Sequence, residues 1–204
     1  MKIAVLTSGG VAPGMTAAVR AAAQAAFARG WEAVVVEEGY YGLLEGSIRP
    51  VDRRVLWGFV QQGGTALGTG RSYEFEEGEE GKEKALEKLR EAGVGGLVVI
   101  GGGGSLSGGL ELHKRGMPTV GVPATIDNDI PQTELSIGVD TTLNTAVAVI
   151  DRIKDTATAH RRAMVVGVLG RDSGYLAVTS AIAGGADATI VPSSRQTRRK
   201  SSTS

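Results

Sequence analysis

Two carboxylates stand two residues apart in the segment VPATIDNDI, at Asp127 and Asp129, with a hydroxyl at Thr125 and an amide at Asn128. In an extended segment alternate side chains project to the same side, so both carboxylates would face one site. One of them could then take a proton from a substrate hydroxyl while the other orients that hydroxyl or a metal-bound water. The alternative is a turn in which Asp and Asn side chains bond the local backbone, and spacing alone favours it.

Two glycine turns could bind phosphate. The segment TSGGVAPGM places Gly9 and Gly10 between an apolar run and a helical stretch, and VVIGGGGSLSGG runs from an apolar strand into Gly101–Gly104 and then Ser105. Such turns let an anion approach backbone amides at a helix N-terminus, although many are only tight connections. The second turn has no carboxylate, whereas magnesium with phosphates is normally held by one or two.

Basic side chains could supply positive charge to the same site. Arg162 and Arg171 could each hold a phosphate through a bidentate guanidinium, and Arg71 could do so unless it forms a surface salt bridge. His160 is more typical of a helix C-terminus than of a catalytic base.

Apolar runs that alternate with helical stretches would position these groups. The runs are 3–6, 33–36, 97–100, 119–122, 164–169 and 188–191, and the helical stretches include 14–30, 79–93 and 140–160. Strands that are continuously apolar suit a parallel sheet covered on both sides. The pattern predicts a doubly wound, mostly parallel α/β sheet with helices on both faces, which binds ligands at the carboxyl ends of its strands.

The composition is that of an ordinary globular protein. The chain has 204 residues, 42% of them hydrophobic, with 22 basic and 22 acidic side chains and no cysteine. We therefore expect one α/β domain over residues 1–192, in the cytoplasm, with neither nucleic acid nor membrane as a partner. Residues 193–204 carry no apolar side chain and four positive charges, which predicts a disordered basic tail.

Six segments in order resemble the ATP-dependent 6-phosphofructokinase family, from residue 1 to about residue 192. They are TSGGVAPGMTAAVR, GGTALGTGRSYEF, VVIGGGGSLSGG, PATIDNDI, SIGVDTTLNTAVAVIDRIKDTATAHRR and VGVLGRDSGYLA. The resemblance implies a phosphofructokinase-like, Rossmann-type fold, magnesium with ATP as cofactor, and ATP and fructose 6-phosphate as substrates. The γ-phosphoryl group of ATP would pass to the 1-hydroxyl of the sugar, as in glycolysis.

The resemblance also assigns roles to individual residues. Asp127 would be the catalytic base, and Arg171 would stabilise the transferring phosphoryl group. Arg162 would reach the substrate of a neighbouring subunit, which implies a homo-oligomer. The other sugar-phosphate contacts would be Thr125, Asp129, Leu169 and Gly170. The nucleotide would lie along Gly10, Arg71, Ser72, Gly102, Gly104 and Ser105. An effector nucleotide would bind Arg20, Arg53, Lys154, Gly185 and Asp187, although Gln24 replaces one arginine of that site.

The departures from the family pattern predict impaired activity. Val11 and Gly103 each stand where the family has an aspartate, and the aspartate missing at 103 is the one that handles magnesium. The family's chains also continue beyond the position of Pro192, so part of the sugar-phosphate site is expected to be missing. The small Gly104 and Ala124 favour ATP over pyrophosphate as donor. The alternative function is a non-catalytic nucleotide-binding or regulatory fragment; a dinucleotide oxidoreductase is disfavoured because the first turn lacks G-x-G-x-x-G.

Overall fold

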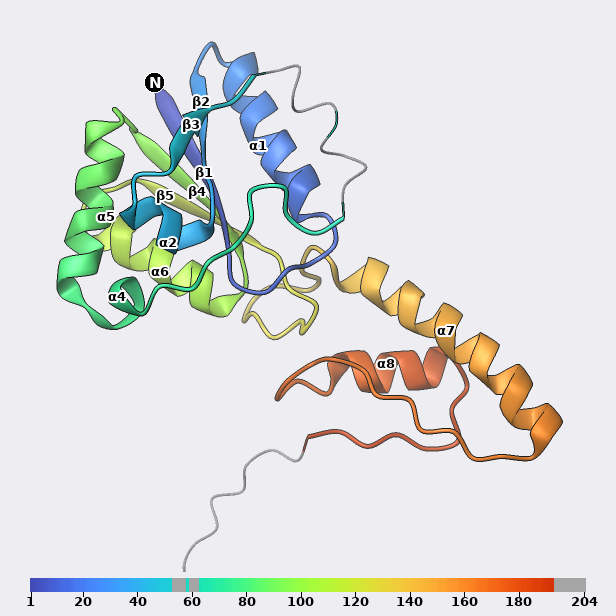
Figure 1. Ribbon diagram of the computed structural model, residues 1–204. Coiled ribbons are helices and arrows are strands. Elements are labelled where there is room, and N and C mark those ends of the chain that lie inside the picture. The colour runs from blue at the N-terminus through green and yellow to red at the C-terminus, as the bar shows by residue number, and fades with distance from the viewer. Residues whose placement is uncertain (53–57, 59–62, 193–204) are drawn as a thin grey trace, which may run out of the picture.

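The fold is seen in a computed structural model, which describes residues 1–52, 58 and 63–192. Its centre is a five-stranded sheet in the order β3-β2-β1-β4-β5 (Figure 1). The strands are β1 (Lys2–Ser8), β2 (Glu32–Val36), β3 (Ile48–Pro50), β4 (Gly96–Gly101) and β5 (Thr119–Pro123). All neighbouring strands pair in parallel except β3, which runs antiparallel to β2.

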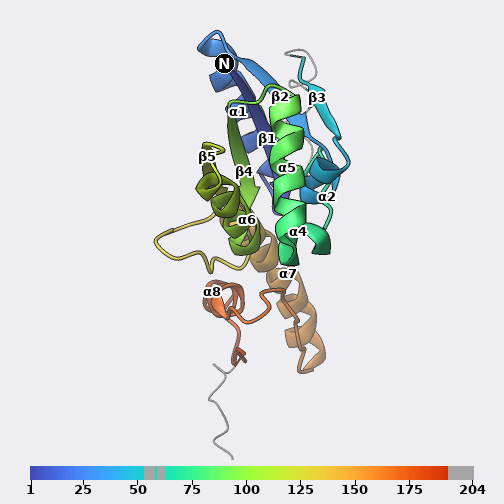
Figure 2. The ribbon, with the colours of Figure 1, turned by 90° about the vertical axis from the view of Figure 1, so that its left-hand side faces the viewer.

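Helices cover both faces of the sheet, as predicted for a doubly wound α/β fold (Figures 1 and 2). On one face α1 (Met15–Ala28) packs Met15 against Val5 and Ile100. The other face is covered by α2 (Gly39–Leu44), α4 (Tyr73–Glu77), α5 (Glu79–Glu91) and α6 (Gly103–Lys114). There Leu6 of β1 is buried with Leu89 of α5 and Leu112 of α6. These two apolar layers hold the strand ends in place.

Two further helices extend away from the sheet. The longer, α7 (Val139–His160), has 22 residues, and α8 (Tyr175–Ala183) packs alongside it (Figure 1). His160 is the last residue of α7, which confirms the expectation that it lies at a helix C-terminus. In the part of the chain that the structure describes, no helix is both long and apolar enough to cross a bilayer.

Two predicted strands are wrong. Residues 164–169 and the described residues 188–191 are not in strands, and apolar side chains project from both into solvent. Val165 is 99% exposed and Ile190 is 91% exposed. A strand needs a neighbour for its backbone hydrogen bonds, and the described residues give neither segment one. Conversely, β3 was not predicted, because three residues that include Arg49 and Pro50 form no apolar run. The predicted tail at 193–204 lies outside the described residues.

Candidate active site

Three loops meet at the carboxyl ends of neighbouring parallel strands. The turn after β1 lies against the turn after β4, since a Cβ on Gly9 would be 2.8 Å from Ser105 Oγ. The turn after β4 lies against the loop after β5, since a Cβ on Gly102 would be 3.7 Å from Thr125 Cβ. The predicted glycine turns and the Asp-containing segment therefore lie next to one another at this edge of the sheet, where α/β folds bind ligands.

The first glycine turn is held by hydroxyls from a distant part of the chain. Thr69 Oγ1 donates to the Gly9 carbonyl at 2.8 Å, and Thr7 Oγ1, just before the turn, lies 2.8 Å from Thr65 Oγ1. Gly10 is exposed, with no atom within 4 Å of where its Cβ would be. Backbone amides at Gly10 are thus open to an approaching anion.

The second glycine turn opens a helix of twelve residues. Gly102 is the N-cap of α6, and the next two residues, Gly103 and Gly104, are exposed, with open space where their Cβ atoms would be. Ser105 is buried, and its carbonyl accepts a 2.7 Å hydrogen bond from the Tyr40 hydroxyl. The first turn of α6 is therefore held by Tyr40 on its buried side and open to solvent at Gly103 and Gly104. Such a helix N-terminus can accept a phosphate.

The loop after β5 is a turn and not an extended segment. Asn128 has a left-handed backbone with φ of 49°, and its side chain bonds two residues further along the loop. The Asn128 amide donates to the Glu134 carbonyl at 3.1 Å, and its carbonyl accepts from the Ser136 amide at 3.1 Å. The Asp127 amide donates to Thr125 Oγ1 at 3.1 Å. The turn that the spacing favoured is therefore the conformation found at Asn128, and the extended alternative is not.

The turn still brings Asp127 close to the charges that matter for chemistry. Burial and the negative charge of Asp129 raise the pKa of Asp127, and the nearby Arg171 guanidinium partly offsets that rise. Asp127 is half-buried, whereas Asp129 and Arg171 are exposed. The Ser173 hydroxyl donates to the Asp127 carbonyl at 2.6 Å and so ties the Arg171 turn to the Asp127 loop. One carboxylate and one guanidinium thus lie close together in the loops that follow β5 and precede α8.

For the other residues assigned to the sugar phosphate, which are Leu169, Gly170 and Arg162, the structure shows no hydrogen bond or ion pair with Asp127 among the described residues. Gly170 is buried with φ of 155°, and its carbonyl accepts from the Ser173 amide at 2.7 Å, so it shapes the turn that carries Arg171. Leu169 is 75% exposed. Arg162 follows the distal end of α7, a helix about 33 Å long at 1.5 Å per residue. That end of α7 points away from the sheet in Figure 1, whereas Asp127 belongs to the loop after β5.

Two of the residues assigned to nucleotide binding, Arg71 and Ser72, interact with neighbouring residues of the chain. Arg71 forms the surface ion pair that was its alternative role, with its Nε 3.4 Å from Glu76 Oε1. Ser72 is buried and caps α4, where its Oγ accepts from the Phe75 amide at 3.2 Å. Both lie in the segment that follows Thr69, whose hydroxyl braces the first glycine turn.

The predicted effector residues come together only in part. Lys154 Nζ donates to the carbonyls of Gly184 and Gly185, each at 3.0 Å, and Asp187 is exposed nearby in sequence. Arg20 lies on α1 in the sheet portion, away from the α7–α8 pair (Figure 1). Arg53 lies outside the described residues.

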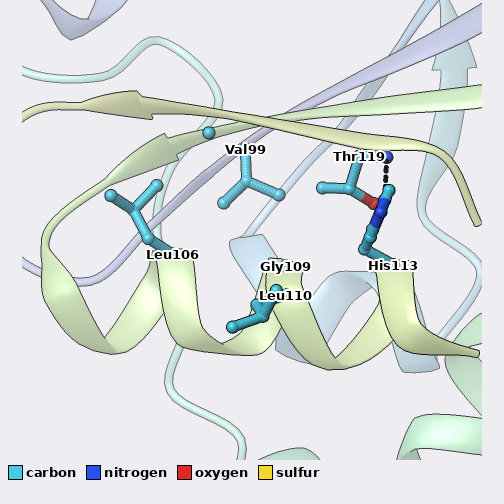
Figure 3. A pocket seen from close by; sticks show the side chains of 7 residues that line it. Val99, Leu106, Gly109, Leu110, His113 and Thr119 are labelled. Carbon is cyan, nitrogen blue, oxygen red and sulfur yellow. Dashed lines mark hydrogen bonds between the residues drawn. The ribbon is translucent and has the colours of Figure 1, made fainter.

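Among the described residues there is no group of three or more His, Asp or Glu side chains that could hold a metal ion. Val11, where the family resemblance led us to expect an aspartate, is 52% exposed and contributes no charge. A separate open groove of about 350 Å³ runs along α6 and β5, lined by Val99, Leu106, Leu110 and His113 (Figure 3). Because no carboxylate lines it, we assign it no part in the chemistry.

Several supporting residues were not predicted. Ser173, Tyr40 and Thr69 act through hydrogen bonds to main-chain carbonyls far away in sequence. Thr69 and Ser173 lie inside segments that carry the family resemblance, which was the one available signal. No spacing rule singles them out.

Comparison with known proteins agrees with this geometry. The family model for phosphofructokinase matches residues 2–203, and the chain therefore belongs to the phosphofructokinase family. It is 49% identical over 191 residues to an ATP-dependent 6-phosphofructokinase of Lysinibacillus sphaericus, across 94% of this chain and 60% of that protein. It is 50% identical over 192 residues to the enzyme of that name from Thermotoga neapolitana, again across 60% of the relative. The chain thus spans about three-fifths of these relatives.

Solved structures confirm the fold. Phosphofructokinase from Saccharomyces cerevisiae matches with a TM-score of 0.86 and 39% identity, over 91% of this chain and 28% of that one. A pyrophosphate-dependent phosphofructokinase from Marinobacter aquaeolei matches with a TM-score of 0.74 at 21% identity, over 90% of this chain and 49% of that one. The second likeness bears on the fold alone.

Proposed function

We propose that the chain performs 6-phosphofructokinase chemistry, transferring the γ-phosphoryl group of ATP to the 1-hydroxyl of fructose 6-phosphate. The observation that carries the proposal is the grouping of Asp127, Asp129 and Arg171 beside two glycine turns at one sheet edge. Family membership and the names of the most similar relatives support the choice of donor and acceptor.

The residues divide the reaction between them. The 1-hydroxyl oxygen attacks the γ-phosphorus, the bond from that phosphorus to the β–γ bridging oxygen breaks, and ADP leaves. Asp127 takes the hydroxyl proton, and a raised pKa makes its carboxylate a stronger base than an ordinary aspartate. Arg171 offers its guanidinium to the charge on the transferring phosphoryl group. Amides at Gly102, Gly103 and Gly104 receive the nucleotide phosphates at the start of α6.

Small residues favour ATP over pyrophosphate in this proposal. Ala124 is buried directly after β5, and Gly104 is exposed with open space beside it. Neither residue puts a charged or bulky side chain where the nucleoside part of ATP would lie. A homo-oligomer is part of the same proposal, because Arg162 follows the far end of α7 and the family resemblance assigns it to the site of a neighbouring subunit.

Magnesium fits this chain poorly. Divalent magnesium with nucleotide phosphates is normally held by one or two carboxylates, and the turn that opens α6 has Gly103 in the position of the family aspartate. Loss of one charge-stabilising group commonly costs on the order of 10²–10³ in rate. We therefore expect slow turnover. The same observation favours the alternative, a nucleotide-binding part without catalysis.

A coupled assay for fructose 1,6-bisphosphate tests the proposal. With ATP, magnesium and fructose 6-phosphate at saturation, we expect slow formation above a blank, and loss of roughly 10²–10⁴ in Asp127→Asn. Asp155→Asn, on the exposed surface of α7, is the matched control and should retain the wild-type rate. Equal rates in wild type and Asp127→Asn would refute catalysis by this site. Turnover at the blank level, combined with calorimetric ATP binding, would support the non-catalytic alternative.

A further inference from the structure

Residues 64–70 form an irregular segment that buried hydroxyls of the sheet portion hold in place. Thr16 Oγ1, on α1, donates to the Gly64 carbonyl at 2.8 Å and accepts from the amide two residues further on at 3.2 Å. Thr7 Oγ1, near the end of β1, donates to the Gly68 carbonyl at 3.0 Å. Thr7 is fully buried and Thr16 is 1% exposed. Because a buried hydroxyl needs a partner, these bonds fix the segment against β1 and α1.

The hydroxyl hydrogens next to Thr7 can be assigned from these contacts. A threonine hydroxyl has a single hydrogen, and that of Thr7 goes to the Gly68 carbonyl. Thr65 is therefore the donor in the 2.8 Å contact between its Oγ1 and Thr7 Oγ1. Thr65 Oγ1 in turn accepts from the Leu67 amide at 3.3 Å, and the Leu67 side chain is buried in the apolar layer beneath α1. The segment is thus anchored by a directed chain of bonds and by one apolar side chain.

The segment reaches the first glycine turn through Thr69. Its Oγ1 donates to the Gly9 carbonyl at 2.8 Å. In a trans peptide the carbonyl of one residue and the amide of the next point in opposite directions within one plane. The bond from Thr69 therefore also fixes the direction of the Gly10 amide, which points away from Thr69. Gly9 has φ of 83° and, as a glycine, a wide choice of conformations, so a bond from outside the turn is needed to fix this peptide.

The Gly10 amide is available as a hydrogen-bond donor. Between the residues that the structure describes it makes no hydrogen bond, and Gly10 is exposed. Backbone amides that are oriented by a turn and left unpaired are donors to anions. What the turn offers a phosphate therefore depends on how the peptide before Gly10 is held.

We propose that Thr69 is a positioning residue for the nucleotide, whose hydroxyl holds the peptide between Gly9 and Gly10 so that the Gly10 amide donates to a phosphate oxygen. The buried hydroxyls of Thr7 and Thr16 hold the segment that carries Thr69. The ligand is taken from the proposed function, on which the inference rests, but the role of Thr69 concerns binding and not phosphoryl transfer. A bound phosphate should likewise strengthen the bond from Thr69 to Gly9, because linkage between two such events is reciprocal.

Calorimetry with ATP in EDTA, without sugar, tests this role. Thr69→Val removes the hydroxyl and keeps the shape, and Thr69→Ser keeps the hydroxyl. We expect Thr69→Val to bind ATP about tenfold more weakly than wild type and Thr69→Ser to bind within about twofold of it, since a hydrogen bond to a charged group is misdirected in the first variant alone. Thr145→Val is the matched control, because Thr145 on α7 also has an exposed hydroxyl that donates to a carbonyl, at Thr141, and it should bind as wild type does.

Nuclear magnetic resonance supplies a readout that a change in stability would not move. On addition of ATP in EDTA, the Gly10 amide proton of wild type should shift downfield, as expected for an amide that donates to a phosphate oxygen. In Thr69→Val the same proton should shift much less, and Thr69→Ser should restore the wild-type shift. The melting temperatures of the three proteins should agree, because Thr69 is exposed and its bond is open to solvent.

The inference is overturned if wild type binds no ATP at millimolar concentration, or if Thr69→Val binds ATP as tightly as wild type. It is also overturned if Thr69→Ser binds as weakly as Thr69→Val, because the hydroxyl would then not be the group that matters. Failure of the proposed function looks different. Turnover at the blank level, together with weaker ATP binding in Thr69→Val alone, would remove catalysis and leave the role of Thr69 standing.

Discussion

Asp127 stands in an environment whose effects on its carboxylate oppose one another. Partial burial and the neighbouring Asp129 raise its pKa, and Arg171 lowers it by a smaller amount. A carboxylate with a native pKa above its unfolded value reduces stability once it is ionised. The raised pKa of Asp127 therefore lowers the free energy of unfolding at neutral pH and makes the carboxylate a stronger base, a combination often found at catalytic sites.

The raised pKa of Asp127 predicts how the stability of one variant depends on pH. Asp127→Asn should have a higher free energy of unfolding than wild type at neutral pH, by less than about 1 kcal/mol because solvent screens a half-exposed group. The gain should shrink as pH falls through the raised pKa of Asp127 and vanish below the ordinary aspartate range, where both side chains are neutral. Urea unfolding at a series of pH values measures it. A variant that is less stable than wild type at neutral pH would contradict the assignment.

At the residue scale, the sequence predicts the candidate reactive residues more readily than the residues whose hydrogen bonds position them. Asp127 and the glycine turns could be predicted because each follows an apolar strand, and parallel strands end at a common edge. Ser173 could not, because its bond to the Asp127 carbonyl joins residues 46 positions apart through a main-chain atom. A turn at this segment was the favoured interpretation, but the spacing could not show that Asn128 would be the residue with the left-handed backbone.

At the scale of elements, α2 supports the helix that carries the second glycine turn. Tyr40 of α2 is buried, stacks on Phe75 with ring centroids 4.0 Å apart, and donates its hydroxyl hydrogen to the Ser105 carbonyl. Burial raises the pKa of the Tyr40 phenol, so the hydroxyl remains a donor throughout the neutral range. The position of the α6 N-terminus thus depends on a contact from another helix.

Removing that hydroxyl should be measurable. Tyr40→Phe keeps the ring stack and deletes the bond, which should lower the free energy of unfolding by about 1 kcal/mol. Tyr41→Phe, with a side chain 48% exposed on the same helix, is the matched control and should be neutral. Thermal denaturation of both variants makes the comparison. Equal melting temperatures for the two variants would show that the bond does not support α6.

The strands show why a local pattern does not suffice for an element. Runs at 3–6 and 97–100 became β1 and β4 because each found parallel neighbours. The run at 164–169 is equally apolar, yet the described residues provide it with no neighbour. Apolar periodicity therefore predicts the capacity to form a strand, while pairing decides the outcome.

At the scale of the whole molecule, burial is unevenly distributed. The sheet and its covering helices contain nearly all the buried apolar side chains of the described residues, whereas α7 buries only Val139 and Ile150 along its 22 residues. Local stability follows the density of buried apolar contacts. The α7–α8 pair should accordingly open more readily than the sheet.

Hydrogen exchange measures this difference directly. Amides in the distal half of α7 should exchange at least tenfold faster than those of β1 and β4 in the isolated chain, because sub-global opening needs less free energy than global unfolding. Mass spectrometry of peptides from both regions gives the ratio. Equal protection across the two regions would mean that α7 unfolds only with the sheet.

The central claim is that the turn opening α6 receives nucleotide phosphates but lacks the carboxylate that magnesium requires. Gly103→Asp restores that carboxylate in open space at the first position of α6, where an acidic residue also suits the helix dipole. Calorimetry should compare ATP affinity in wild type and variant, in EDTA and in magnesium. We predict that Gly103→Asp binds ATP more weakly than wild type in EDTA and more tightly in magnesium. An identical ratio of affinities in the two conditions would contradict the claim.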